Sequence, residues 1–135
     1  MKIYFGHPIN TYDTKLELLI IAAIHREFPN AKLVNPNQIH HQYAFQRCQG
    51  LLGDGMKYFL EEVLPGCEGG VFLPFRDGLF GAGVAKEALV LLKEAKPIWS
   101  VTVGDDEITF IPIKSQDQIK SLTLEETLLR LENPY

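Results

Sequence analysis

The chain has few of the features that mark membrane, secreted or metal-binding proteins. It holds two cysteines in 135 residues, Cys48 and Cys67, which are far apart and form no CxxC spacing. Such a pair favours neither a metal site nor a redox couple, so we expect two inert thiols. The sequence also has no signal peptide and no apolar run long enough to span a bilayer. We therefore expect a cytoplasmic protein with no membrane contact.

The chain also has only a small excess of charge of one sign. The formal net charge is -4, from 13 basic and 17 acidic residues, and no block of like charges occurs. Because duplex nucleic acid requires a basic surface, a nucleic-acid polymer is not an expected partner, although a single nucleotide stays open. The histidines, His7, His25, His40 and His41, lack metal-ligand spacing, and the G-x-S-x-G nucleophile motif is absent. We expect no metal and no cofactor.

Strand and helix patterns alternate along the chain, and its length fits one domain, residues 1–135. Strands are expected at residues 2–5, 31–34, 71–74, 97–103 and 107–112, and helices at residues 54–64, at 84–95, and after Thr14 and Thr123. This alternation predicts an α/β fold, a three-layer α/β/α arrangement with a mainly parallel Rossmann-like (flavodoxin-like) sheet. The turn at residues 104–106 allows a hairpin that adds an antiparallel edge strand. Thr14 with Glu17, and Thr123 with Glu126, have capping-box spacing.

Two loops follow predicted parallel strands and should meet at one crevice, at the carboxyl edge of the sheet. The first loop, residues 6–13, is expected to be exposed, and its candidate ligand contacts are Gly6, His7, Pro8 and Asn10. The second loop, residues 76–83, contains the candidates Arg76, Gly81 and Gly83. Either loop alone is also typical of an ordinary turn. Their convergence is what predicts a ligand site.

Glu87 follows the second loop, near the start of a predicted helix. The positive end of the helix dipole would hold a carboxylate there ionised, which suits a nucleophile and not a proton donor. The alternative is a solvent-exposed face, because Glu87 shares a helical stripe with Glu94 beside Lys86 and Lys93. The spacing alone favours the exposed face, and both interpretations stay open.

Asp77 follows Arg76 at the mouth of the same loop. A second carboxylate near Glu87 would meet the requirement of glycosyl transfer, in which two carboxyl groups flank the bond that breaks. An Arg-Asp pair in a loop is more often a surface ion pair of small energetic value. The pair therefore predicts either a shared pocket or a solvated contact.

Three segments resemble the nucleoside 2-deoxyribosyltransferase-like superfamily, which includes deoxyribosyltransferases and nucleoside 5'-monophosphate N-glycosidases. KIYFGHPIN resembles its first strand and sugar or phosphate loop, LVNPNQ its second strand and Asn-Pro turn, and GAGVAKEALVLLKEAKPIW its glycine loop and glutamate helix. The resemblance implies that Glu87 attacks the anomeric carbon and that Asp77 contacts sugar or base. It also implies a sugar or 5'-phosphate end at Gly6, His7, Pro8 and Asn10.

The same resemblance implies a homodimer whose sites are completed across subunits, with the tail at Pro134 and Tyr135 as the candidate segment. Where the family commonly has an Asp-containing run before the third strand, this chain has Glu68 among small residues, and Glu68 is a candidate substitute. The interval from Asp77 to Glu87 is also longer than the family's usual spacing. The implied activity is cleavage or transfer at the N-glycosidic bond of a nucleoside or nucleotide. The alternatives are a non-catalytic nucleotide-binding or sensing module, and a structural domain whose glycines serve turns only.

Overall fold

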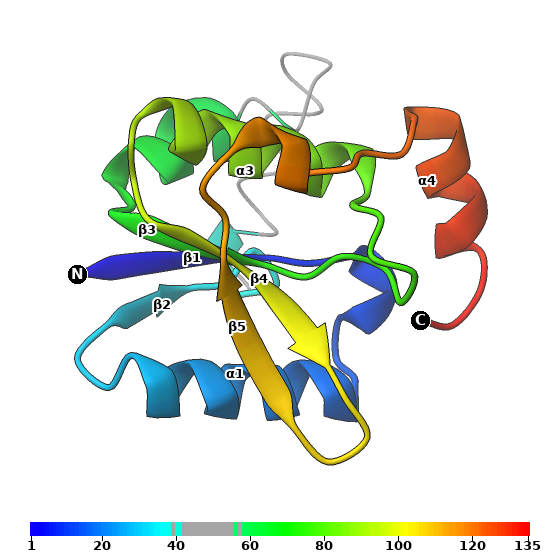
Figure 1. Cartoon of the computed structure of the whole chain (residues 1–135), viewed down its shortest axis with the longest axis horizontal. Coiled ribbons are helices and arrows are strands. Elements are labelled where there is room, and N and C mark those ends of the chain that lie inside the picture. Colours follow the sequence, from blue (N-terminus) through cyan, green and yellow to red (C-terminus); the bar gives the residue numbers. More distant parts are fainter. Residues whose placement is uncertain (39, 42–55, 57) are drawn as a thin grey trace.

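A computed structural model describes residues 1–38, 40–41, 56 and 58–135 and contains one five-stranded sheet (Figure 1). The strands are β1 (Lys2–Gly6), β2 (Lys32–Val34), β3 (Gly69–Phe72), β4 (Ile98–Val103) and β5 (Ile108–Pro112). Their order is β2-β1-β3-β4-β5, with every neighbouring pair parallel except β4 and β5. The predicted α/β class, the mainly parallel sheet and the antiparallel edge hairpin are thus confirmed.

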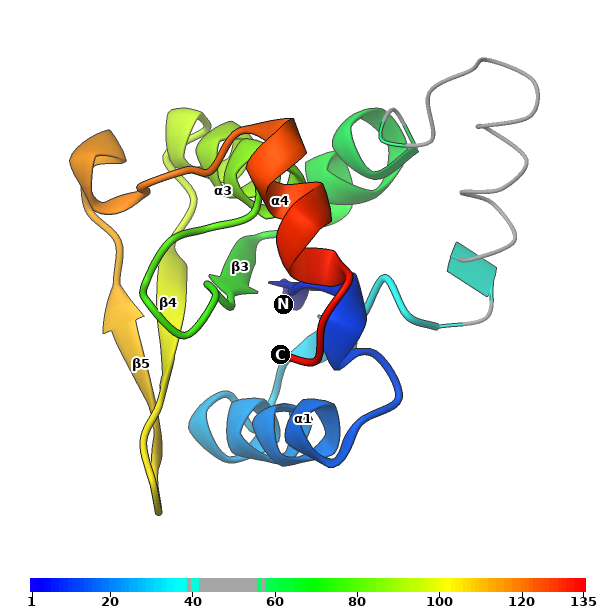
Figure 2. The ribbon, with the colours of Figure 1, turned by 90° about the vertical axis from the view of Figure 1, so that its right-hand side faces the viewer.

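Helices cover both faces of this sheet (Figures 1 and 2). The α-helices are α1 (Lys15–Glu27), α3 (Ala82–Lys93) and α4 (Leu124–Leu131). A π-helical turn η2 (Tyr58–Val63) and the 3-10 turns η1 (Ile9–Thr11), η3 (Leu64–Gly66) and η4 (Gln116–Gln118) complete the described helical segments. Helix α1 lies on one face and α3 on the other, whereas α4 stands at the carboxyl ends of the parallel strands.

The core follows the alternation of side chains along each strand. In β1, Ile3 and Phe5 point toward α1, where they belong to one cluster with Ile20 and Ile24. Tyr4, between them, points to the opposite face and joins the cluster that includes Leu91 of α3. All of these side chains are almost completely buried. Because a buried strand must fill both faces, the sequence KIYFG is apolar without alternation.

Two glycines that precede the predicted third strand lie inside the observed strand β3. Gly69 and Gly70 are the first residues of β3, whereas the sequence predicted a strand at residues 71–74. A Cβ atom on Gly69 would lie 2.8 Å from the Pro97 carbonyl oxygen, and one on Gly70 would lie 2.6 Å from the Phe72 ring. Close packing against Pro97, Leu91 and the Phe72 ring of the same strand leaves no room for a side chain at these positions, so the glycines do not mark a turn.

The capping predictions are confirmed for one helix and half confirmed for the other. Thr123 and Glu126 form a complete capping box at α4. At α1 the Thr14 hydroxyl accepts a hydrogen bond from the Glu17 backbone N–H at 3.2 Å. The Glu17 carboxylate, however, turns away from the Thr14 backbone and enters a buried polar network described below.

Several sequence predictions fall outside the described residues. These are the prediction for Cys48, the prediction of irregular structure or a short helix at residues 42–49, and the predicted helix start at Asp54. The end of that predicted helix is described and is the η2 turn. Helix α3 spans Ala82–Lys93 instead of residues 84–95, so the helix begins directly after Gly81.

Candidate active site

A cavity of about 310 Å³ opens at the carboxyl edge of the sheet. Most of its wall comes from the loop after β1, the first two turns of α3, and α4, and Tyr4, Phe59 and Phe75 also line it. The loop contributes His7, Pro8 and Tyr12, and the start of α3 contributes Gly81, Gly83 and Glu87. The crevice predicted from the two loops therefore exists, and α4 is a third wall that the sequence did not predict.

Glu87 points inward from α3 and lines this cavity. It is 5% exposed and shares the buried stripe of the helix with Val84, Ala88 and Leu91. The interpretation that the spacing alone favoured, a solvated helix face, is wrong. The stripe places Glu87 on the core side, one turn after Val84 and one turn before Leu91.

The absence of a side chain on Gly6 makes room for the Glu87 carboxyl group. A Cβ atom on Gly6 would lie 3.3 Å from Glu87 Oε1 and 2.6 Å from the Phe72 ring. Gly6 ends β1, in register with Phe72 of β3. Glycine at this position therefore allows the carboxyl group and the ring to pack against the strand end.

The Glu87 carboxyl group is neutral near pH 7. Burial raises its pKa to about 8, and the hydrogen bond donated by the Tyr4 hydroxyl to Oε2 lowers it only in part. This corrects the expectation of a carboxylate held ionised by the helix dipole, because removal from water outweighs the dipole here. Burial, and then the negative charge of Glu87, raise the pKa of Tyr4 well above its usual value.

His7 belongs to a buried polar network that fixes the first loop. Its Nδ1–H donates to the Phe5 carbonyl oxygen at 3.0 Å, and its Nε2 lies 2.7 Å from Glu17 Oε2. The Asn37 amide donates to both Glu17 oxygens, at 3.1 and 3.2 Å. Burial raises the pKa of Glu17, but the hydrogen bonds from His7, Asn37 and the Asp13 backbone outweigh it, and the net pKa is lowered.

This network corrects the expectation of an exposed first loop in part, since Ile9 and Asp13 are exposed and the loop is otherwise buried or half-buried. His7 and Thr11 are 4% and 1% exposed, and the His7 ring stacks on Phe5 with centroids 3.8 Å apart. The loop thus forms part of the cavity wall at His7, Pro8 and Tyr12. Asn10, in contrast, does not line the cavity. Its amide donates to the Asn133 carbonyl oxygen at 2.8 Å and ties the loop to the end of the chain.

Asp77 and Arg76 are not brought to the cavity wall. The Asp77 carboxylate is half exposed and forms a two-pronged ion pair with the Arg130 guanidinium, at 2.8 and 2.6 Å. Hydrogen bonds from Arg130 lower the Asp77 pKa. Arg76 donates to the Tyr135 main-chain oxygen at 3.0 Å and lies over its ring. The prediction of a pocket shared with Glu87 is therefore wrong. Asp77 does form a solvated ion pair, but its partner is Arg130 and not Arg76.

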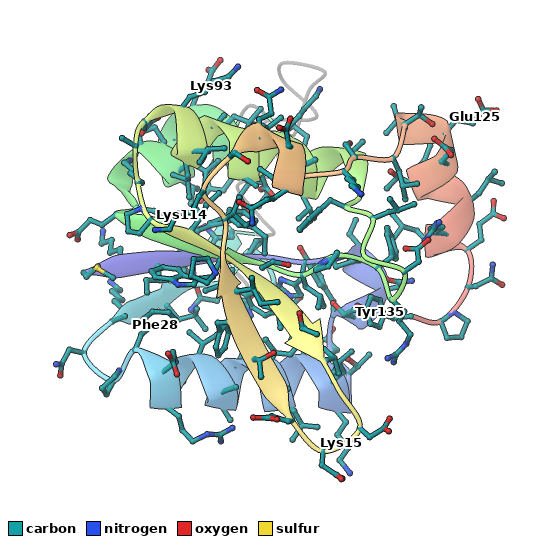
Figure 3. All side chains as sticks on the ribbon, in the orientation of Figure 1. Lys15, Phe28, Lys93, Lys114, Glu125 and Tyr135 are labelled. Atoms are coloured by element: carbon teal, nitrogen blue, oxygen red, sulfur yellow. The ribbon has the colours of Figure 1, made fainter. Side chains whose placement is uncertain are left out.

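Glu68 and the C-terminal tail also differ from what the resemblance implied. Glu68 is exposed at the start of β3, the amino end of the sheet, where it accepts from the Lys2 backbone N–H at 3.2 Å. It lies at the opposite edge from the cavity and cannot substitute for a residue there. Tyr135 folds back on its own chain, with its hydroxyl donating to the Pro74 carbonyl oxygen at 2.5 Å (Figure 3).

Sequence reasoning missed Tyr4, Tyr12 and the α4 residues of the wall. Tyr4 sits in an apolar strand and looks like core, although a tyrosine in a fully buried strand needs a partner for its hydroxyl, which was a usable signal. Tyr12 is largely buried at the cavity, and burial raises its pKa above the normal range. The position of α4 depends on how the chain returns after β5, which local patterns do not encode.

Comparison of the chain with protein-family models, with curated proteins and with solved structures finds no match. Among the described residues, no group of three or more His, Cys, Asp or Glu side chains could hold a metal ion. Within the same residues, no helix has the length and apolarity to cross a membrane. The candidate site must therefore be judged on its own geometry.

Proposed function

We propose that this protein cleaves or transfers the N-glycosidic bond of a nucleoside or nucleotide, with Glu87 as the reacting group. One observation carries the proposal: a buried carboxyl group, with its pKa raised to about 8, forms part of the wall of a small-molecule cavity. Strongly shifted acidic groups in clefts are concentrated at functional sites, because structural roles rarely repay burying a carboxyl group. The resemblance at the three sequence segments supplies the reaction class.

The cavity suits a planar, largely apolar ligand. Aromatic rings of Tyr12, Phe59 and Phe75 line it, and such rings stack on nucleobases. Its volume of about 310 Å³ lies at the small end of the range for ligand pockets. A sugar bonded to the base would then lie against the Glu87 carboxyl group and the Gly6 strand end.

In the proposed reaction the ionised Glu87 carboxylate attacks C1' of the sugar. A bond forms between the carboxylate oxygen and C1', and the C1'–N bond breaks with its electron pair passing to the base, which takes up a proton from water. Water then hydrolyses the glycosyl ester, or a second base accepts the sugar. Tyr4 keeps the attacking carboxyl group oriented by its hydrogen bond to Oε2.

The test is release of free base from a panel of nucleosides and nucleoside monophosphates, followed by chromatography. Glu87→Gln should lower kcat/KM at least about 100-fold, since the amide cannot form the glycosyl ester. Glu94→Gln, an exposed carboxylate at the end of the same helix, is the matched control and should retain the rate. Equal rates for Glu87→Gln and the wild type would remove Glu87 from the mechanism.

The pH dependence tests the role of Glu87 separately. A nucleophile must be ionised, so kcat/KM should rise with pH to a plateau above about 8. A profile that falls through the same pH would assign Glu87 as a proton donor instead. Both outcomes differ from the flat profile expected if Glu87 does not react.

The second candidate is a non-catalytic nucleotide-binding or sensing module. It is favoured by the placement of Asp77 away from the cavity, which leaves Glu87 as the only acidic side chain among the described lining residues. Thermal stabilisation by a nucleotide, without base release over a long incubation, would support it.

Three finer points belong to the same proposal. We infer a three-layer Rossmann-like, flavodoxin-like arrangement, supported by the strand order and by helices on both faces of the sheet. A homodimer follows from the resemblance and is checked by sedimentation. A cytoplasmic location and the lack of a nucleic-acid polymer as partner remain predictions from composition.

A further inference from the structure

Helix α4 and the residues after it form one wall of the cavity. We define this C-terminal arm as residues 124–135. Four of its side chains line the cavity: Leu124, Thr127, Leu128 and Leu131. Viewed from the carboxyl edge, α4 crosses in front of the ends of the strands (Figure 2). A ligand that enters from this side must pass the arm.

Helix α4 contributes little to the hydrophobic core. Neither buried core cluster of the described residues contains an α4 side chain, and Thr127 is the helix's one buried residue. Leu124 and Leu128 remain 66% and 56% exposed, although they line the cavity. Glu125, on the outer side of the helix, points away from the sheet (Figure 3). Packing therefore does not fasten α4 to the body of the protein.

The arm is anchored firmly just before α4. The Phe80 backbone N–H donates to the Lys120 carbonyl oxygen, and the Leu122 N–H donates to the Phe80 carbonyl oxygen, both at 2.8 Å. Leu122 is buried, so this backbone pairing lies within the protein. One turn into α4, the Thr127 hydroxyl accepts from the Ala82 N–H at 2.9 Å. The segment around Leu122 can thus act as a fixed pivot.

The far end of the arm is held by polar contacts at the surface and by Tyr135, which is partly buried and stacks on Phe75. Arg130 pairs with Asp77 through two hydrogen bonds, and the Asn133 carbonyl oxygen accepts from the Asn10 amide. The Arg130 and Asp77 side chains are 35% and 46% exposed. Ion pairs this exposed are weak and screened by salt. Asp77 and Asn10 come from the two loops that frame the cavity, so the contacts close the arm over it.

We propose that the C-terminal arm is a lid over the cavity, pivoting near Leu122 and latched by the Asp77–Arg130 ion pair. This assigns Asp77 a conformational role in place of contact with substrate. Opening breaks exposed polar contacts, the Thr127–Ala82 hydrogen bond and the packing of Tyr135 on Phe75, and it leaves the buried members of both core clusters in place. The proposal stands on the geometry of the arm and does not depend on which reaction the cavity supports.

The experiment is amide hydrogen exchange on the full chain, read by peptide mass spectrometry. In the wild type, amides of α4 should exchange at least about tenfold faster than those of α3, since local opening exposes them. Asp77→Asn should accelerate exchange in α4 by a further factor of about three to ten and leave α3 unchanged. Raising the salt concentration should accelerate α4 exchange in the wild type more than in Asp77→Asn.

Two further variants isolate the latch from general destabilisation. Arg130→Gln should reproduce the effect of Asp77→Asn, and the charge-swapped pair Asp77→Arg with Arg130→Asp should restore slow exchange. Glu94→Gln removes the comparable Glu94–Lys96 ion pair elsewhere on the surface and should leave α4 unaffected. Exchange of α4 as slow as that of α3 in both the wild type and Asp77→Asn would show that α4 is a fixed wall. Acceleration spread equally over α3 and α4 would likewise overturn the lid.

Discussion

Replacing Glu87 with glutamine should stabilise the folded protein relative to the wild type, and this gain should be larger at neutral pH than at acidic pH. The pKa of Glu87 rises from 4.5 to about 8 on folding. The folded state therefore binds the proton more tightly, and the free energy of unfolding of the wild type falls as pH rises from about 4.5 to about 8. Above about pH 8 the free energy of unfolding no longer changes with the ionisation of Glu87, because the group is then ionised in both states.

The magnitude follows from the two pKa values. Each unit corresponds to about 1.4 kcal/mol, so the ionisable side chain costs about 3 kcal/mol at pH 7 and about 1 kcal/mol at pH 5. Glutamine has no such dependence, and its carbonyl oxygen can still accept the Tyr4 hydrogen bond. The change in the free energy of unfolding caused by Glu87→Gln should therefore be more favourable at pH 7 than at pH 5 by about 2 to 3 kcal/mol.

The assay is urea unfolding of the wild type and Glu87→Gln at both pH values, with linear extrapolation to water. Comparison between two pH values cancels any constant effect of the added amide NH2 group. Every other titrating group contributes equally to both proteins. The expected difference corresponds to roughly 9 °C in melting temperature for a domain of this size.

Glu94→Gln is the control, because its carboxylate lies on the surface at the opposite end of the same helix. It should show no difference between the two pH values beyond about 0.5 kcal/mol. The same small difference for Glu87→Gln would mean that Glu87 titrates near its ordinary pKa in the folded protein. Burial would then not keep the Glu87 carboxyl group neutral at pH 7, and the proposed function would lose its main support.

Three further predictions concern the surroundings of the cavity. Gly6→Ala should lower the free energy of unfolding by about 1–3 kcal/mol in urea titrations, because its Cβ meets the Phe72 ring, whereas Gly66→Ala, with nothing within 4 Å, should have little effect. Glu17, with its pKa lowered, adds stability that is lost as pH falls below about 4.5, so Glu17→Gln should flatten the acid limb of melting temperature against pH. Cys67, whose pKa burial raises to about 11, should resist iodoacetamide at pH 8 until urea unfolds the protein, as peptide mass spectrometry can show.

The succession of strands and helices along the chain could be predicted in outline, because short apolar runs alternate with amphipathic helices and end at turn residues. The two-loop crevice also followed from this pattern, since parallel strands bring their carboxyl ends to one edge. Gly69 and Gly70 show the limit of the approach. Glycine normally signals a turn, and only the closeness of Pro97 and Phe72 explains why these two lie inside a strand.

The candidate site was likewise predictable from the sequence only in part. Local spacing was sufficient to select Glu87 but could not orient it, because the stripes of α3 that face the core and the solvent are both compatible with its sequence. Asp77 shows the opposite case: it belongs to the second loop, but it pairs at the surface with Arg130, which is 53 residues away in the chain.

Composition and periodicity settle the elements of this protein, since helices and strands depend on contacts between near neighbours in the chain. The direction of Glu87, the burial that raises its pKa, and the arrival of α4 at the cavity depend on partners far apart in the sequence. Tyr4 and Glu87, for example, are 83 residues apart and meet only when β1 packs under α3. Such contacts leave no local pattern, and the chemistry of the site rests on them.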